Sequence, residues 1–325
     1  MVRAFIAMIV LAALNIGFVN TVSAQLARTW VSGVGDDANP CSRTAPCATF
    51  ASAVPRTLAS GEVNCLDSGG FGPVTITKAI TIRCDGGAIG GILAVDTDAI
   101  VVQAGIDDFV YLIGLDLEGM GRMVSGQPVA AGGLNGIHFL SGRSLTIENC
   151  SIRNFRQSGI QYVSHNAFSF LNVSGTKIHN SGTEGSAYGI YISPYGDGIV
   201  NITRSDIVGN TQGISVQGGA YTRKVAGVVS DTNVNANRLL GISILKNSAE
   251  SLVLSLDNVR VVGNGSYALV ANGVGTGMLV GRSTINHNER GLLPVGGGLL
   301  ISYGNNAVNG NNSRDGAFSS VIPMK

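Results

Sequence analysis

Ile207-Val-Gly-Asn210, Val234-Asn-Ala-Asn237 and Ile285-Asn-His-Asn288 are three copies of a pattern that recurs between Glu148 and Asn312. In each copy an aliphatic residue is followed two or three positions later by Asn, and the pattern occurs seven times. The seven Asn residues are Asn154, Asn180, Asn210, Asn237, Asn264, Asn288 and Asn311. They are 26, 30, 27, 27, 24 and 23 positions apart, and a loose period in the twenties is typical of a solenoid.

The apolar runs between these Asn residues are short and rich in β-branched side chains, as in Ser144–Ile147, Gly198–Ile202 and Leu252–Leu256. Gly and Asn separate the runs, no window shows a clean helical stripe, and the fixed Leu consensus of leucine-rich repeats is missing. A parallel β-helix remains, in which short strands joined by tight turns stack about 4.8 Å apart. Asn tolerates the positive φ of a sharp bend, and its amide can bond to the amide one coil away. We therefore predict that the seven Asn residues form one ladder.

Residues 1–24 are predicted to be a secretory signal, because Arg3 precedes the apolar run Ala4–Val19 and Val22-Ser-Ala24 is a small-residue cleavage site. The alternative is a membrane anchor, but the run is short for a span and no later segment could serve as one. The mature chain is then expected to be secreted or periplasmic. Its 20 Lys plus Arg, after Arg3 is removed from 21, balance 20 Asp plus Glu.

Charged residues make up 13% of the chain, about half the usual share, so no nucleic-acid partner is expected. No cofactor is expected, and no ligand set for a metal is recognised. The sequence does not determine the oligomeric state.

Five cysteines in an exported chain predict disulfides. Cys41 and Cys47 enclose a short loop, and Cys65 and Cys84 lie in apolar runs that would stack in adjacent coils, so we pair them accordingly. Cys150 is left over, and we interpret it as a buried apolar thiol rather than a reactive nucleophile.

Residues 25–60 are predicted to form an N-terminal cap, followed by a parallel β-helix over 61–312 and a tail over 313–325. The cap contains a helical pattern from Ala48 to Ser60 that is interrupted by Pro55. A short or kinked helix is expected there, with Phe50, Ala53, Val54 and Leu58 on its apolar side, and it would cover the open end of the stack.

Three motifs carry a resemblance to a known family: Gly35–Cys41, Ala45–Ala53 and Val74–Cys84. Together with the Asn repeat and a Gly-Ile pair that recurs at 159–160, 189–190, 213–214 and 241–242, they resemble bacterial exported right-handed parallel β-helix proteins of the pectin-lyase-like superfamily. The resemblance covers nearly the whole mature chain and implies an all-β, single-stranded right-handed parallel β-helix of about ten coils with a short N-terminal capping helix. The superfamily includes polysaccharide lyases, glycoside hydrolases, epimerases and adhesins, so the resemblance is specific for the fold and weak for the activity.

An outward column of side chains is predicted from the Gly-Ile-x-Ile repeat, since the residue between two inward Ile residues faces solvent. The column contains His138, Gln161, Tyr191, Ser215 and Ser243, with further polar residues beyond it: Arg143, His165, Tyr195 and Asp197. Such a face could bind a polysaccharide or cell-surface glycan, and the alternative is an ordinary solvated sheet.

The catalytic patterns of the superfamily's hydrolases and calcium-dependent lyases are not recognisable, so the catalytic residues remain unknown. Asp206, Asp231 and Asp257 have the spacing of stacked carboxylates but look like turn residues. A lyase also needs a base, for which several arginines are candidates: Arg143, Arg153, Arg156, Arg204 and Arg223. The leading hypothesis is a non-catalytic glycan- or surface-binding protein, and the alternative is a polysaccharide lyase or glycoside hydrolase.

Overall fold

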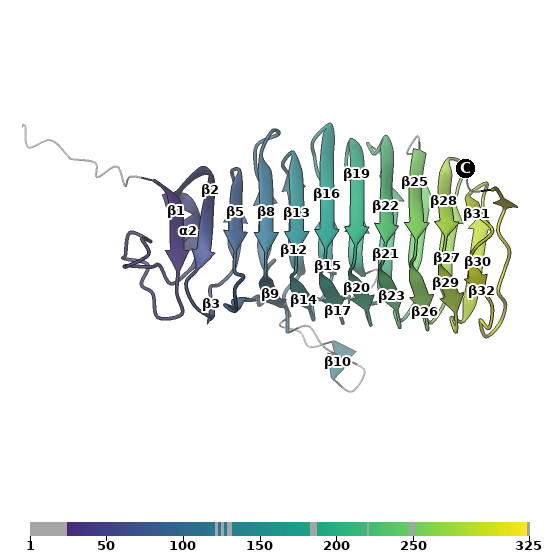
Figure 1. Cartoon of the computed structure of the whole chain (residues 1–325), viewed down its shortest axis with the longest axis horizontal. Helices are drawn as coiled ribbons and strands as arrows, with labels where there is room; N and C mark the ends of the chain where they lie inside the picture. Colours follow the sequence, from purple (N-terminus) through teal and green to yellow (C-terminus); the bar gives the residue numbers. More distant parts are fainter. Residues whose placement is uncertain are drawn as a thin grey trace, which may run out of the picture.

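The computed structural model describes residues 25–120, 123–124, 127–128, 132–182, 187–219, 221–246 and 251–323. The predicted secretory signal, residues 1–24, lies outside them. Three sheets of stacked strands make up an elongated right-handed solenoid of about ten coils, with β1 near one end and β31 near the other (Figure 1). All strand pairs between described residues are parallel, except the antiparallel pair of β10 (Met123–Val124) and β11 (Gln127–Pro128). The parallel β-helix predicted from the repeat is confirmed.

The first sheet has twelve strands. They are β1 (Leu26–Val31), β2 (Thr57–Cys65), β5 (Ile80–Arg83), β8 (Phe109–Ile113), β13 (Ser144–Glu148), β16 (Phe168–Ser174), β19 (Asp197–Thr203), β22 (Lys224–Ser230), β25 (Ser251–Asp257), β28 (Thr276–Gly281), β31 (Leu299–Ser302) and β33 (Ser320–Val321).

The second sheet has nine strands. They are β4 (Val74–Ile76), β7 (Ile100–Gln103), β12 (Asn135–Ser141), β15 (Ser158–Tyr162), β18 (Tyr188–Ile192), β21 (Gln212–Gly218), β24 (Ile242–Lys246), β27 (Tyr267–Asn272) and β30 (Arg290–Val295).

The third sheet has ten strands. They are β3 (Gly69–Gly70), β6 (Gly90–Leu93), β9 (Leu115–Glu118), β14 (Ser151–Arg153), β17 (Lys177–His179), β20 (Asp206–Val208), β23 (Asn233–Asn235), β26 (Arg260–Val262), β29 (Thr284–Asn286) and β32 (Ala307–Val308).

Each coil passes through the first, third and second sheets in turn, and the repeat positions stack in register. In the third sheet the aliphatic residue of each repeat pairs with its counterpart one coil away, from Ile152 and Ile178 through to Ile285 and Val308. Ile152, Ile178 and Ile207 are 0% exposed, so this column forms part of the apolar core. Burying a column of Ile and Val is the main favourable term that holds successive coils together.

Five of the predicted Asn residues form a buried ladder, each three positions after the inward aliphatic residue. Nδ2 of Asn210 donates to Oδ1 of Asn237 at 3.2 Å, and Nδ2 of Asn237 donates to Oδ1 of Asn264 at 2.9 Å. The column continues through Asn288 to Asn311 in the same way. Each Oδ1 also accepts the backbone N–H of the previous Asn, so two donors that would otherwise be buried without a partner are satisfied.

The ladder prediction is wrong for Asn154 and Asn180. Both lie only two positions after the inward Ile, with φ of 60° and 55°, whereas Phe155 and Ser181 occupy the ladder position. The matching residues of later coils also have positive φ: Gly209, Ala236, Gly263, His287 and Gly310. The two functions assigned to one Asn therefore belong to two adjacent positions, one for the bend and one for the ladder.

Helix α2 (Phe50–Arg56) is the one helix among the described residues and packs against β1 and β2. Thr49 caps its N-terminus by accepting the amide of Ser52 at 3.1 Å. Phe50, Ala53 and Val54 are buried as expected. Leu58 is a correction, because the helix ends at Arg56 and Leu58 lies in β2 with 44% of its surface exposed.

Both predicted disulfides are present. Cys41 bonds to Cys47 with their Cα atoms 4.7 Å apart, and Cys65 bonds to Cys84 with their Cα atoms 4.9 Å apart. The second bond links the coil of β2 to that of β5. Cys150 is a buried free thiol, and burial raises its pKa to about 12.

Candidate functional site

The predicted outward column is aligned on the second sheet. His138 pairs with Gln161, Gln161 with Tyr191, and the column continues to Ser215 and Ser243. The first three side chains are half-buried and face a pocket. Ser215 and Ser243 are a correction, because both are 0% exposed and their hydroxyls lie 3.1 Å apart.

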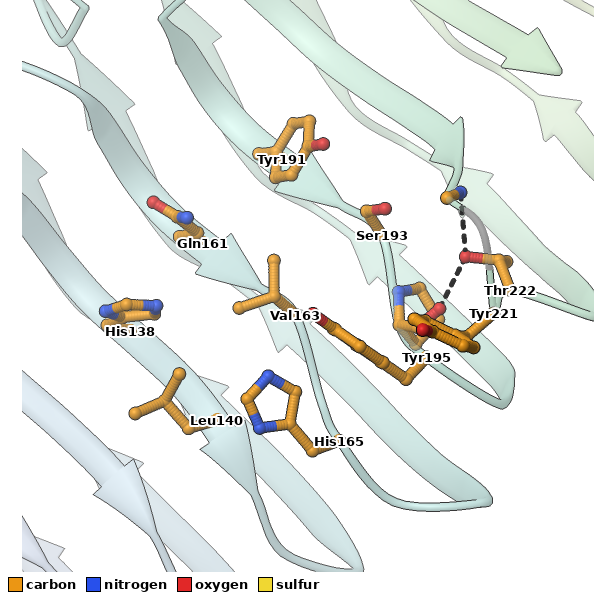
Figure 2. A pocket seen from close by; sticks show the side chains of 12 residues that line it. His138, Leu140, Gln161, Val163, His165, Tyr191, Ser193, Tyr195, Tyr221 and Thr222 are labelled. Atoms are coloured by element: carbon orange, nitrogen blue, oxygen red, sulfur yellow. Dashed lines mark hydrogen bonds between the residues drawn. The ribbon is translucent and has the colours of Figure 1, made fainter. Parts of the chain in front are cut away.

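A pocket of about 490 Å³ opens over this column (Figure 2). It extends across four coils, from the strand β12 to the segment after β21. Its walls are His138, Leu140, Gln161, Val163, His165, Tyr191, Ser193, Pro194, Tyr195, Gly219, Tyr221 and Thr222. Because strands stack about 4.8 Å apart, four coils span roughly 14 Å. We call this pocket the groove.

Three exposed rings from successive coils form one wall of the groove. The imidazole of His165 meets the ring of Tyr195 edge-on with centroids 4.5 Å apart, and Tyr195 stacks on Tyr221 at 5.2 Å with ring planes 10° apart. Tyr195 is 46% exposed and Tyr221 is 67% exposed. In Figure 2 the ring of Tyr195 reaches in towards Val163. Large exposed aromatic surface beside a pocket is a common feature of binding sites.

His138 is held by Asp98 at the N-terminal end of the groove. Its Nδ1 lies 2.8 Å from Oδ2 of Asp98, whose Oδ1 accepts the backbone amide and the side-chain amide of Asn135. Burial would raise the pKa of Asp98, but the hydrogen bonds from His138 and Asn135 together lower it below its ordinary value. Asp98 is therefore ionised at neutral pH, and its bond to Nδ1 fixes the orientation of the imidazole.

Tyr191 is positioned from the opposite side by polar side chains of the next coil. Its hydroxyl donates to Oε1 of Gln217 at 3.5 Å, and Nε2 of Gln217 donates to the hydroxyls of Tyr188 at 2.9 Å and Ser215 at 3.3 Å. The rings of Tyr188 and Tyr191 lie 4.9 Å apart. This network explains why Ser215 has no free surface.

Thr222 orders the turn that carries Tyr221. Its hydroxyl donates to the carbonyl of Pro194 at 2.5 Å and accepts the amide of Gly219 at 3.0 Å, as the dashed lines in Figure 2 show. The stacked ring is therefore supported by a hydrogen-bonded turn.

Two predicted face residues, Arg143 and Asp197, do not line the groove. The chain turns at Gly142, with φ of 145°, so that Arg143 leaves the second sheet just before β13. Its guanidinium lies 4.9 Å from the ring centroid of Phe168 and 5.6 Å from that of Phe170. Asp197 begins β19 in the first sheet and pairs with Phe168.

Three of the other candidate arginines have partners outside the groove. Arg153 forms ion pairs with Asp116 and Glu118, and Arg156 forms one with Asp96 at 3.0 Å. Arg204 donates to the hydroxyl of Ser174 at 2.8 Å.

The three spaced carboxylates also lie elsewhere. Asp206 is in the third sheet, Asp231 occupies a bend with φ of 50°, and Asp257 pairs with Arg282. Within the described residues, no group of three or more His, Cys, Asp or Glu side chains is placed to hold a metal ion.

Sequence reasoning missed Asp98, Leu140, Val163, Ser193, Tyr221 and Thr222. Val163 and Ser193 have a simple signal, because they are the next outward positions after Gln161 and Tyr191. Asp98 and Tyr221 follow no repeat position, since each lies in a segment between strands.

Comparison with known proteins identifies the fold family. A family model described as right-handed β-helix region matches residues 121–285, which is more than half of the chain. The chain therefore belongs to the right-handed β-helix family and is a pectin-lyase-like β-helix protein. It is similar to the crystal structure of pectate lyase Pel9A with a TM-score of 0.62 and 14% identity, over 91% of this chain and 80% of the lyase. No curated protein sequence matches it. In the described residues no helix has the length and apolar character to cross a membrane.

Proposed function

We propose that this protein is an exported glycan-binding protein that holds an oligosaccharide in the groove. The observation that carries the proposal is the exposed stack of His165, Tyr195 and Tyr221 facing the polar column of His138, Gln161 and Tyr191. Sugars present both C–H faces and hydroxyl groups, so a site with aromatic surface opposite amide, hydroxyl and imidazole groups is complementary to them.

The groove also has features of a site that is formed before its ligand arrives. Asp98 holds His138, Gln217 holds Tyr191, and Thr222 holds the turn of Tyr221. Side chains that are already ordered lose little conformational entropy on binding, which favours affinity.

A polysaccharide lyase or glycoside hydrolase is the second candidate, and the pair of His138 and Asp98 favours it. An imidazole oriented by a carboxylate is a suitable general base for proton abstraction. Glycoside hydrolysis normally needs two carboxyl groups beside one glycosidic bond, and the twelve residues that line the groove include none. The pair of His138 and Asp98 therefore favours a lyase over a hydrolase, although no Lys or Arg lines the groove to neutralise the uronate carboxylate on which a lyase acts.

Export is part of the proposal. Residues 1–24 would be removed as a signal, residues 25–60 with helix α2 would close the N-terminal end of the solenoid, residues 61–312 would form the β-helix, and residues 313–325 would form a tail. Two disulfides favour an oxidising compartment, either secreted or periplasmic.

Binding is tested with a glycan array, followed by calorimetry with the glycans that bind. Tyr195→Ala and Tyr221→Ala should each weaken binding about tenfold or more, equivalent to about 1.4 kcal/mol. Tyr111→Ala is the matched control, because Tyr111 is also exposed, at 39%, but lies on β8 of the first sheet. Equal losses in Tyr111→Ala and Tyr195→Ala, or no binding to any glycan, would contradict the proposal.

The two candidate functions are separated by assaying the bound glycans for newly formed unsaturated or reducing ends. A binding protein leaves them intact. Release of product by the wild type, abolished in His138→Gln, would establish the enzymatic alternative.

A further inference from the structure

We propose that the groove selects uncharged sugar residues and excludes uronates; this inference rests on the glycan-binding function proposed above. It concerns the class of glycan and follows from the charges that the groove contains and lacks.

The groove offers hydrogen bonds but no Lys or Arg side chain. Its polar side chains are Gln161, Tyr191, Ser193, Tyr195, Tyr221 and Thr222 together with the two imidazoles, and none of the twelve lining residues is Lys, Arg, Asp or Glu. A uronate carboxylate that enters such a site gives up its hydration and gains no ion pair. An unpaired carboxylate that loses hydration is penalised, whereas sugar hydroxyls find neutral donors and acceptors here.

One charged group in direct contact with the lining, Asp98, has the wrong sign for an anionic ligand. Asp98 touches His138, its side chain is only 13% exposed, and it stays ionised because its hydrogen bonds lower its pKa. In this partly desolvated position its field is screened less than that of a surface carboxylate. A second carboxylate close to His138 would be repelled.

Two arginines lie close to the lining in the sequence, and neither is among the residues that line the groove. Arg223 follows Thr222 and is exposed just before β22 of the first sheet. Arg143 follows the strand of His138 by two residues, but its guanidinium lies over the rings of Phe168 and Phe170. Moving it to the groove would give up both contacts between the cation and the rings.

The test begins by screening wild type and Tyr195→Ala against an array of neutral, uronate, sulfated and amino-sugar glycans. Glycans that bind the wild type but lose binding in Tyr195→Ala are ligands of the groove. The inference requires these to be neutral. An anionic or amino-sugar ligand of the groove overturns it and leaves the proposed function in place, whereas the absence of any such ligand removes the proposed function itself.

A matched pair of ligands then isolates the charge. Each neutral ligand is compared with its counterpart oxidised at C6 to a uronate, which changes the charge and keeps the ring stereochemistry. The wild type should bind the uronate about tenfold or more weakly, a difference of about 1.4 kcal/mol. Equal affinities for the two forms would overturn the inference.

Val163→Lys provides the reciprocal test, because Val163 lies in the middle of the groove, between Gln161 and His165 (Figure 2). An added ammonium group should strengthen uronate binding and so reduce the difference in affinity between the neutral glycan and its uronate counterpart. Val163→Met is the control for the added length without charge. The inference is overturned if Val163→Met narrows the difference as much as Val163→Lys does.

Discussion

Nδ1 of His138 lies 2.8 Å from Oδ2 of Asp98, although 40 residues separate them in the sequence. The solenoid creates this contact, because β12 stacks on β7 and pairs His138 with Val101, three residues after Asp98. When the imidazole is neutral, its Nδ1–H donates this bond, which leaves Nε2 without a hydrogen. The pair therefore joins one wall of the groove to the preceding coil, and it couples the groove to the titration of a carboxyl group.

Acid should weaken the fold in part through Asp98. Its pKa is lowered in the folded chain, so its contribution to stability is complete above its unfolded pKa of about 3.9 and is lost as the pH falls through the folded pKa. The difference in unfolding free energy between wild type and Asp98→Asn should be larger at pH 6 than at pH 3.

Urea titrations at both pH values measure this difference. Asp107→Asn removes an exposed carboxylate between β7 and β8 and controls for the change in net charge. If Asp98→Asn lowers the unfolding free energy by the same amount at both pH values, Asp98 is not the source of the acid sensitivity.

The Asn ladder should be far less tolerant than the bends beside it. Asn237→Gly leaves the buried backbone N–H of Asn210 without its acceptor and removes one of the two acceptors of its Nδ2, so it should lower the unfolding free energy by about 2 kcal/mol or more. Asn180→Gly makes the same substitution at a residue with φ of 55°, where Gly has no steric penalty, so its effect should be a few tenths of a kcal/mol. Chemical denaturation of both variants measures the two losses, and similar losses would show that the ladder has no special role.

Cys150 should resist thiol reagents in the folded protein. Burial raises its pKa to about 12, so almost no thiolate is present at pH 8, and only 3% of the residue is exposed. Labelling with iodoacetamide should be negligible in buffer and should reach one thiol per mature chain in denaturant, since the other four cysteines are in disulfides. Rapid labelling without denaturant would mean that the third sheet opens near β14.

The disulfide between Cys65 and Cys84 should stabilise the N-terminal coils more than the one between Cys41 and Cys47. The sequence separations are 19 and 6, and on the chain-entropy account the longer loop corresponds to about 3 kcal/mol and the shorter to about 2 kcal/mol. The double variants Cys65→Ala/Cys84→Ala and Cys41→Ala/Cys47→Ala test this order by denaturation. The reverse order would indicate that strain or residual structure dominates over loop closure.

Much of the fold could be predicted because a stacked coil repeats its requirements. An inward Ile or Val recurs wherever a coil must contact the next one, and this recurrence is visible without any knowledge of the structure. The ladder was predicted less well, since Asn at two and at three positions after the aliphatic residue was treated as one feature. A shift of one residue moves a side chain from a buried corner to an exposed bend, as Asn180 and Asn210 show.

The candidate site could be predicted only where it follows the repeat. His138, Gln161 and Tyr191 occupy equivalent positions, and the register brings them together. Tyr221 and Asp98 lie in segments whose length and conformation differ from coil to coil, so their arrival at the groove depends on turn geometry that the repeat does not encode. Arg143 was misplaced for the same reason, because the turn at Gly142 carries it to another sheet.

The column of amides has a direction. Every Nδ2 donates towards the C-terminal neighbour, and the last donor, Asn311, gives both its backbone N–H and its Nδ2 to Oδ1 of Asp315 at 3.0 and 2.7 Å. These bonds lower the pKa of Asp315. The ionised carboxylate of Asp315 therefore accepts the hydrogen bonds at the position that the Asn of a further coil would occupy. An engineered protein could thus be lengthened by inserting whole coils between Asn210 and Asn311, each with its own Asn. A coil added after Asp315 would first need Asp315→Asn, because a carboxylate accepts hydrogen bonds but has no N–H to donate to the next Asn.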